Sequence, residues 1–156
     1  MKRIPLTQGK DALVDDKDFG VLNQYNWYTR KHRNTFYAQR KTKRINGKNE
    51  IILMHAQIIK TPKGMATDHR DNDGLNNQRK NLRVCSNAEN LMNRGKPSNN
   101  TSGYKGVSFY KPTKKWRAYI SKNGKIISLG HHTSKQDASE AYIKACKKYH
   151  GEFANY

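Results

Sequence analysis

The chain has 156 residues and a mass of 18.1 kDa, a length that suits one domain or two small ones. Its 31 Lys and Arg residues against 12 Asp and Glu give a formal charge of +19, while only 34% of the residues are hydrophobic. This composition excludes a large apolar core, and no apolar run approaches the roughly 18 residues that a membrane span needs. So basic a chain favours nucleic acid as its partner, and it disfavours acidic scaffolds, secreted mini-proteins and most small-metabolite enzymes.

The first 60 residues predict a small, twisted antiparallel sheet. Its strands are expected over Arg3–Leu6, Ala12–Val14, Asn26–Arg30, Thr35–Thr42 and Glu50–Lys60. Asp15 or Asp16 is expected to cap a brief helix that follows the second strand. Asn46-Gly47 supplies the residues of a type I′ turn, so it predicts a hairpin between the last two strands.

Residues 65–94 have a different pattern, which predicts a strand, a polar loop, a second strand and a helix. Asp71 to Gly74 has the composition of a turn, and Leu82–Cys85 is expected to be the second strand. Ser86 and Glu89 have the spacing of a capping box, which predicts the start of a helix over residues 87–94. The segment is therefore expected to be a β-hairpin followed at once by a helix.

The stretch from Gly95 to Gly103 is rich in Gly, Pro, Ser and Asn and is interpreted as a linker. Ser134 is expected to cap a long helix over Lys135–His150, whose alanine face suits close packing on a sheet. The sheet itself is predicted from three strands, Tyr104–Tyr110, Trp116–Ser121 and Lys125–Gly130, with Asn123-Gly124 as the second turn. The second half therefore predicts three antiparallel strands backed by one helix.

From Lys96 to Lys135 the chain has nine basic residues and no acidic one. A surface of single sign gains affinity for a phosphate backbone because binding releases counterions. Aromatic residues are interleaved with these charges: Tyr104, Phe109, Tyr110, Trp116 and Tyr119. The alternative interpretation is a solubilising face, but the interleaved aromatic residues favour nucleic-acid binding.

Four polar residues between positions 68 and 90 have the chemistry that phosphodiester cleavage needs. Such cleavage takes a base that activates water, a metal ion that stabilises negative charge and a group that orients the base. Asp68 and His69 offer a carboxylate and an imidazole at the end of one strand, and Asn81 precedes the returning strand. Asn90 lies one turn into the capped helix, from which it is expected to project back toward Asp68. Two oxygen ligands of this kind suit a hard divalent cation such as Mg²⁺.

These four residues, with Asn76-Asn77 and Asn93-Arg94 near them, resemble the HNH endonuclease motif, the ββα-metal finger. His69 and Asn81 are twelve positions apart and Asn81 and Asn90 are nine apart, which resembles the asparagine-ending subclass of phage and intron-encoded homing endonucleases. The resemblance implies that His69 is the general base and that Asn81 holds its imidazole in register. It also implies that Asp68 and Asn90 bind a single metal ion. His55 is similar to the histidine of a strand that often precedes the motif, and we interpret it as architectural.

The residues after the linker resemble the DNA-binding domain of plant ethylene-response factors. The similar segments are Gly103–Val107, Trp116–Ala118, Leu129-Gly130, Asp137–Tyr142 and Gly151-Glu152. In that family the three-stranded sheet lies in the major groove, and the DNA contacts implied by position are Lys105, Ser108, Tyr110, Trp116, Arg117, Tyr119 and Lys125. Ser108, Tyr119 and Ile126 stand where charged residues are common in the plant domains, so plant-type base specificity is not implied.

Together these patterns predict an α+β fold with an HNH nuclease domain over residues 1–94, a linker over 95–102 and a DNA-binding domain over 103–156. Within the first domain, a small antiparallel β region is expected to lead into a ββα-metal finger over about 65–94. In the second, a three-stranded antiparallel sheet is expected to pack on one helix.

The expected activity is that of a metal-dependent homing endonuclease that nicks or cuts duplex DNA, with Mg²⁺ or Mn²⁺ as its metal. Cys85 and Cys146 are isolated from each other, so neither a disulfide framework nor a zinc site is expected. We expect a cytoplasmic monomer, in the bacterial host if a phage encodes it, with no membrane partner and no small-molecule cofactor. Two alternatives stay open: a non-catalytic DNA-binding regulator, and a structure-specific nuclease of phage recombination or packaging.

Overall fold

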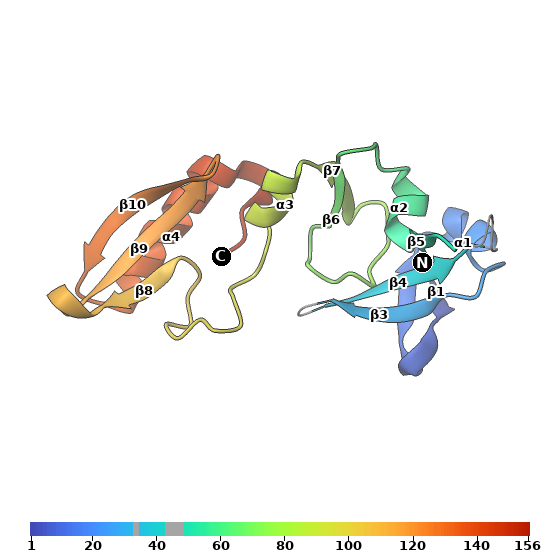
Figure 1. Cartoon of the computed structure of the whole chain (residues 1–156), viewed down its shortest axis with the longest axis horizontal. Helices are drawn as coiled ribbons and strands as arrows, with labels where there is room; N and C mark the ends of the chain where they lie inside the picture. Colours follow the sequence, from blue (N-terminus) through green and yellow to red (C-terminus); the bar gives the residue numbers. More distant parts are fainter. Residues whose placement is uncertain (33–34, 43–48) are drawn as a thin grey trace. The chain divides into compact units, whose positions relative to one another are not determined.

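The computed structural model describes residues 1–32, 35–42 and 49–156, which form two compact units, Met1–Asn87 and Ala88–Tyr156 (Figure 1). Both units combine small antiparallel sheets with helices, so the expected α+β class is confirmed at that level. The predicted Asn46-Gly47 turn lies outside the described residues. Within the described part of the chain, no helix is long and apolar enough to cross a membrane.

In the described residues of the first unit, the strands form three antiparallel sheets of two, three and two strands. β1 (Lys2–Pro5) pairs with β2 (Asp11–Val14), and α1 (Asp16–Leu22) follows them. A 3-10 turn, η1 (Thr7–Gly9), joins the first two strands. The second sheet has the order β3-β4-β5, from β3 (Tyr28–His32), β4 (Thr35–Lys41) and β5 (Ile51–Leu53). The sequence therefore predicted these strands well, apart from the end of the fifth, but they form two separate sheets and not the single sheet that was expected.

The fifth strand was predicted to run from Glu50 to Lys60, and its second half is instead a helix, α2 (Met54–Ile59). Met54 and Ile58 are four residues apart and both are buried, which is the spacing of one helix face. The helix ends at Lys60, which adopts a left-handed conformation (φ 53°) and donates its backbone N–H to the carbonyl of Ala56. His55 therefore belongs to a helix and not to the expected strand.

The main core of the first unit joins its N-terminal strands to the segments that follow them. It consists of Ile4, Ala12, Val14, Leu22, Trp27, Ala38, Met54, Ile58 and Leu82. The indole N–H of Trp27 donates to the backbone carbonyl of Leu22 at 2.8 Å, so the large buried ring also has a polar partner. Because Leu82 belongs to this core, the strand that contains it is held by residues from the beginning of the chain.

β6 (Ala66–His69) and β7 (Leu82–Cys85) form the third sheet and are followed by α3 (Asn87–Met92). The predicted order of strand, loop, strand and helix is thus observed, although α3 ends two residues before the expected position 94. The division between the two units falls after Asn87, so nearly all of α3 is grouped with the second unit. The domain boundary at residue 94 stays a prediction.

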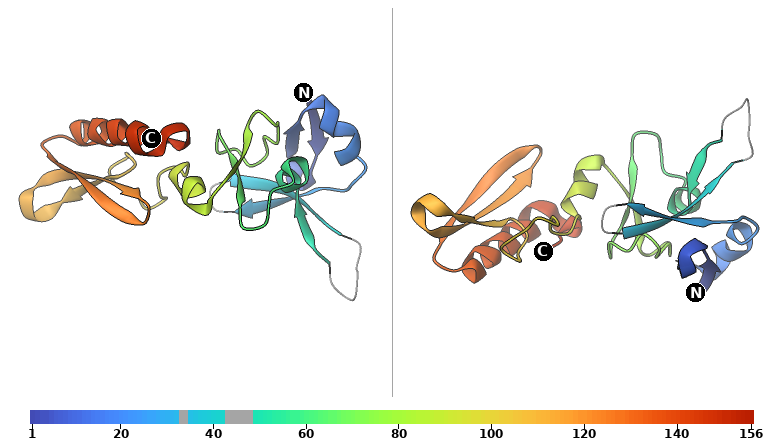
Figure 2. Two further views of the ribbon diagram at one scale, coloured as in Figure 1. Left: turned by 90° about the horizontal axis from the view of Figure 1, so that it is seen from above. Right: turned by 60° about the horizontal axis from the view of Figure 1, so that its bottom comes forward.

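The second unit is a three-stranded sheet with one long helix on one face (Figure 2). The strands have the order β10-β9-β8 and are β8 (Val107–Tyr110), β9 (Lys115–Lys122) and β10 (Lys125–His132). The helix is α4 (Lys135–His150), and two short 3-10 turns complete the unit, η2 (Lys111–Thr113) and η3 (Gly151–Phe153). Ser134 caps α4 as predicted, since its hydroxyl accepts from the Asp137 N–H at 3.0 Å.

β8 begins three residues later than the predicted Tyr104, and Gly106 explains the difference. Gly106 has a φ of +68°, which few residues other than glycine adopt. A Cβ atom at this position would lie 2.1 Å from the Tyr142 ring on α4. The chain therefore approaches α4 too closely, and in the wrong backbone conformation, to be a strand before Val107.

Candidate functional site

Asp68 and His69 lie at the end of β6, side by side in sequence and directly opposite β7. In the antiparallel register Asp68 pairs with Arg83 and His69 pairs with Leu82. Both side chains are buried, with 5% and 4% of their surface exposed. Successive strand residues point to opposite faces of a two-stranded ribbon, so the carboxylate and the imidazole have different surroundings.

The Asp68 carboxylate forms a buried ion pair with Arg83. One carboxylate oxygen, Oδ2, accepts from the Arg83 Nε at 2.8 Å and lies 2.7 Å from a terminal guanidinium nitrogen. A buried charge of this kind needs a partner, because removal from water costs several kcal/mol. Arg83 therefore supplies the charged partner that the buried Asp68 carboxylate needs.

His69 lies in a cluster of aromatic rings from three different elements. Its ring centroid is 5.0 Å from that of His55 on α2 and 5.7 Å from that of Tyr37 on β4. Its Nε2 lies 3.3 Å from the side-chain oxygen of Asn77. Burial lowers the pKa of His69, against the opposing effects of the Asn77 hydrogen bond and the nearby Asp71 carboxylate. The neutral imidazole that results is the form able to accept a proton.

His55 is more strongly affected by the same surroundings. Burial, together with the neighbouring His69, lowers the pKa of His55 to about 3. Two imidazoles in edge-to-face contact are both favoured in the neutral form, since the second charge would repel the first. The architectural role expected for His55 agrees with this position, but the ring also contacts the candidate base directly.

Asn81 makes different contacts from those expected. Its side-chain nitrogen donates to the Asp71 carboxylate at 2.9 Å and to the Asn76 carbonyl at 2.8 Å, and its oxygen accepts from the Asp71 N–H at 3.1 Å. The amide oxygen near the His69 ring belongs to Asn77 instead. Asn81 therefore organises the loop between β6 and β7, and Asn77 takes the position beside the imidazole. Asn77 is one of the residues quoted with the motif, but its burial beside His69 depends on how the loop folds and could not be predicted from the motif.

The loop between β6 and β7 is held by residues from the first 40 positions. Leu13 on β2 donates its N–H to the Leu75 carbonyl at 2.9 Å and accepts the Asn77 N–H at 2.8 Å. The Gly74 N–H donates to the Thr35 hydroxyl on β4 at 3.0 Å. The β1-β2 sheet and the β3-β4-β5 sheet thus together fix the loop that contains Asn77.

A second group of hydrogen bonds connects the end of the same loop to α1 and to the residue before it. Asp15 accepts the Arg79 N–H at 2.8 Å, and the Arg79 guanidinium makes two 2.8 Å bonds to Asp18. Bidentate pairing fixes geometry as well as distance. Asp15 and Asp18 therefore hold the end of the loop in place through Arg79.

Asn90, the second expected metal ligand, lies on α3 in the second unit and is partly buried. Its approach to Asp68 stays a prediction. Among the residues that the structure describes, no group of three or more His, Cys, Asp and Glu side chains is suited to hold a metal ion. The expected pair is a carboxylate and an amide, and Arg83 contacts Oδ2 of that carboxylate. A carboxylate has about four acceptor positions, so this donor set fits a hard divalent cation that keeps several waters.

The face of the second unit's sheet opposite α4 carries four of the seven expected DNA contacts. Ala118 and Ile120 are buried in the clusters that contain α4 residues, so Arg117 and Tyr119 alternate onto the other face. The register places Ser108 opposite Arg117, and Tyr110 lies on the same face, its ring 5.7 Å from the Arg117 guanidinium. Arg117 also lies 5.3 Å from the Tyr119 ring. We call the face formed by Ser108, Tyr110, Arg117 and Tyr119 the open face.

The other three expected contacts lie elsewhere. Trp116 is on the face covered by α4, where it packs against the cluster of Val107, Ala118 and Ala138 and contacts Phe109 edge to face. Lys125 lies two positions before Ile127, which packs under α4, so it is on the same side of the sheet as α4 and is exposed at the turn between β9 and β10. The strand alternation explains both placements, because Trp116 is one position from Arg117 and Lys125 is two positions from Ile127.

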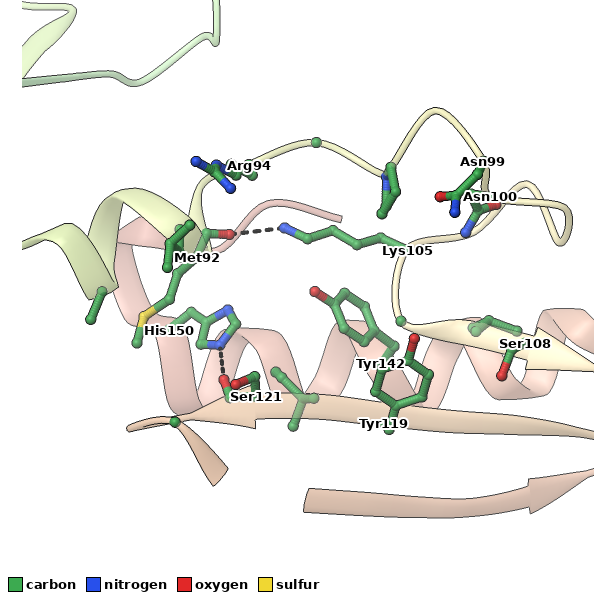
Figure 3. A pocket seen from close by; sticks show the side chains of 18 of the residues that line it. Met92, Arg94, Asn99, Asn100, Lys105, Ser108, Tyr119, Ser121, Tyr142 and His150 are labelled. Carbon is green, nitrogen blue, oxygen red and sulfur yellow. Dashed lines mark hydrogen bonds between the residues drawn. The ribbon is translucent and has the colours of Figure 1, made fainter. Parts of the chain in front are cut away.

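Lys105 is placed inside the second unit, in the wall of a cavity of about 590 Å³ (Figure 3). Its ammonium donates to the backbone carbonyls of Met92 at 2.8 Å and Asn155 at 2.9 Å. Burial lowers the pKa of Lys105. The side chain therefore ties the end of α3 to the C-terminal segment, and the expected contact between its ammonium and DNA does not fit this position.

Comparison with known proteins gives two separate domain matches. Residues 60–92 match the HNH endonuclease family, and residues 102–152 match the AP2 domain. The first match contains Asp68, His69, Asn81 and Asn90, and the second contains the whole sheet of the second unit. No solved structure matches the chain.

Individual relatives follow the same division. Protein 3.8 of Escherichia phage T7 is 37% identical over 98 residues, which cover 61% of this chain and 78% of that protein. An HNH endonuclease of Acanthamoeba polyphaga mimivirus is 23% identical over 147 residues, or 94% of this chain and 74% of its own length. AP2-like ethylene-responsive transcription factor TOE2 of Arabidopsis thaliana is 36% identical over 55 residues, which cover 35% of this chain and 11% of that factor.

Proposed function

The chain belongs to the HNH endonuclease family and carries an AP2 domain, and on this premise we propose that it is a metal-dependent homing endonuclease that cleaves duplex DNA. The observation that carries the proposal is the placement of His69. It is buried beside Asp68, its pKa is lowered by burial, and the Asn77 amide lies 3.3 Å from its Nε2. A fixed, neutral imidazole next to a carboxylate has the properties of a general base for water activation.

His69 would accept a proton from the water that attacks the scissile phosphate. Asp68 and Asn90 would hold one divalent cation, Mg²⁺ or Mn²⁺, which when bound supplies a Lewis acid for the developing charge. Arg83 pairs with the Asp68 carboxylate, and carboxylate oxygens are ligands that such a cation prefers. Asn81 would act on His69 indirectly, by fixing the loop that presents Asn77. The products are expected to be 5′-phosphate and 3′-hydroxyl ends.

The open face of the second unit would hold the duplex and set the register of cleavage. Arg117 supplies a cation and Tyr110 and Tyr119 supply flat rings on one side of the sheet. Most of these side chains do not provide the bidentate base contacts that arginine provides, so part of the specificity would come from DNA shape. One active site in each chain predicts nicking by a monomer. The expected location is the cytoplasm, where the DNA of an infecting phage is accessible.

Cleavage of supercoiled plasmid in the presence of Mg²⁺ tests the proposal. The wild-type protein should convert supercoiled plasmid to nicked circles, and EDTA should stop the reaction. His69→Ala should lower the cleavage rate by about 10²–10⁴-fold, the usual contribution of a general base. Circular dichroism of both proteins at the assay temperature checks that the variant is folded.

The outcomes separate this proposal from its alternatives. Absence of cleavage by both folded proteins, with DNA binding retained, would overturn the nuclease and favour a DNA-binding regulator. Cleavage confined to branched substrates would instead favour a structure-specific nuclease. A preferred site in a long linear duplex, mapped by run-off sequencing of the cleaved DNA, is the result expected for a homing endonuclease.

A further inference from the structure

We propose that Tyr37 is a positioning residue of the nuclease site, and that it holds the ring of His69 in the orientation required for water activation. This inference rests on the proposed function, because it takes His69 as the base. Tyr37 precedes the HNH match by more than 20 residues, and it lies on β4 of the β3-β4-β5 sheet.

Tyr37 contacts both histidines of the ring cluster. Its centroid lies 5.6 Å from His55, with the rings at 71°, and 5.7 Å from His69, with the rings at 59°. His55 and His69 are themselves 5.0 Å apart at 84°. These distances and angles are typical of edge-to-face and tilted aromatic pairs, which have a preferred geometry. Each of the three rings therefore restricts the plane of the other two.

The hydrogen bond between the His69 Nε2 and the Asn77 side-chain oxygen does less to fix that plane. At 3.3 Å it is at the long end of the range for such bonds, and a contact through one ring nitrogen leaves rotation about that line open. Packing against flat neighbours on the sides of the ring removes this rotation. The aromatic contacts therefore complement the contact with Asn77.

Gly74 packs closely against the Tyr37 ring. It is buried in the loop between β6 and β7, and a Cβ atom at this position would lie 2.7 Å from two carbons of the Tyr37 ring and 2.4 Å from the Phe36 carbonyl oxygen. Its φ is not positive, so the requirement for glycine comes from space and not from backbone conformation. The loop thus packs directly on Tyr37, whose ring in turn contacts the candidate base.

Tyr37→Leu tests the proposal, because it keeps an apolar side chain but removes the flat ring. Single-turnover cleavage by protein bound to saturating DNA should slow by roughly 10–100-fold, since small misplacements of a catalytic group cost up to about 10²-fold. The dissociation constant for DNA should change by less than about twofold. Tyr37→Phe, which restores the ring without the hydroxyl, should recover most of the lost rate.

Gly74→Ala applies the same test from the loop side. It should slow the single-turnover rate by a similar factor, because the added methyl group would overlap the Phe36 carbonyl oxygen and the Tyr37 ring and so shift that ring. Gly20→Ala is the matched control, since its Cβ would meet nothing within 4 Å, and its rate should equal that of the wild type. If Tyr37→Leu does not fold, this pair of glycine variants decides the question.

Wild-type rates in both Tyr37→Leu and Gly74→Ala would overturn the positioning role while leaving the nuclease intact, provided that His69→Ala is inactive. Equal losses in Tyr37→Leu and Tyr37→Phe would also overturn it, because the ring would then not be the active feature. Failure of the proposed function has a different result, which is the absence of His69-dependent cleavage in the wild type.

Discussion

The two regions proposed to act on DNA place their functional side chains in opposite surroundings. In the first unit, Asp68, His69 and Asn81 are buried, and each has partners within the protein. On the open face of the second unit, Tyr110 and Arg117 are exposed and contact each other loosely through a cation–π pair. The first arrangement fixes groups before a substrate arrives, and the second leaves them accessible to it.

This difference follows from what each region has to do. A general base must be held in one orientation and one protonation state, and burial among fixed partners achieves both. A surface for DNA gains its affinity by releasing ions and water on contact, so its charges must be solvated before binding. Mutations in the first region are therefore expected to affect stability as well as cleavage, and mutations on the open face to affect binding alone.

The largest effect on stability is expected from Arg83→Met. The variant leaves the Asp68 carboxylate buried without its guanidinium partner, which costs about 3–5 kcal/mol of the free energy of unfolding. Arg79→Met is the matched control, because its partner Asp18 lies in a more exposed pair and the loss should be at most about 1 kcal/mol. Urea denaturation measures both, and equal losses would contradict the distinction between buried and surface pairs.

Within the second unit, Lys105 and Lys125 allow the same contrast between an internally bonded residue and an exposed one to be tested. Lys105→Met removes a charged donor from two backbone carbonyls and should cost about 1.5–3 kcal/mol of stability. Lys125→Met alters an exposed residue and should change stability by less than about 0.5 kcal/mol. Thermal unfolding of the two variants tests this order, and a reversed order would show that the contacts of Lys105 contribute little to the fold.

The lowered pKa of His55 leads to a prediction of how the free energy of unfolding of the first unit depends on pH. Its pKa is lowered from 6.5 to about 3 in the folded protein, so on acidification the unfolded chain binds a proton before the folded one does. Its contribution to stability is therefore complete above pH 6.5 and is lost as the pH falls toward 3. The slope is about 1.4 kcal/mol per pH unit for one proton.

His55→Phe should make this acid dependence shallower, because it removes one of the protons that the unfolded chain takes up. Urea denaturation of the variant and the wild type at pH 7, 6 and 5 gives the two slopes. Parallel slopes would mean that His55 is protonated in the folded protein at these values.

Arg117→Ala should have the smallest effect on the fold and a measurable one on binding. The loss of one phosphate or base contact should weaken DNA binding by roughly tenfold or less. It should also reduce the slope of log Kd against the logarithm of salt concentration by about one. The melting temperature should stay within a few degrees of the wild type, since Arg117 is exposed. Fluorescence anisotropy at several salt concentrations measures the first effect, and unchanged affinity would remove Arg117 from the interface.

The amino-acid sequence alone determined the local elements and the chemistry that they carry. The Ser134 cap, the Asn123-Gly124 turn and the short strands around positions 68 and 83 depend on neighbours in the chain, so local patterns were sufficient to predict them. The basic composition and the polar motif likewise pointed to DNA and to cleavage before any contact was known. The error at Glu50–Lys60 arose because the burial of Met54 and Ile58 on one helix face comes from distant residues.

The tertiary structure decided which side chain meets which. Asn77, rather than Asn81, contacts His69 because the loop is bound to Leu13 and Thr35, which are more than 35 residues away. The Asp68–Arg83 pair and the contact of Tyr37 with His69 depend on strand register and on Gly74. Lys105 turned inward for the same reason, since its partners are the end of α3 and the C-terminal segment. Residue type determines which contacts are chemically possible, but only the packing of segments far apart in the chain selects among them.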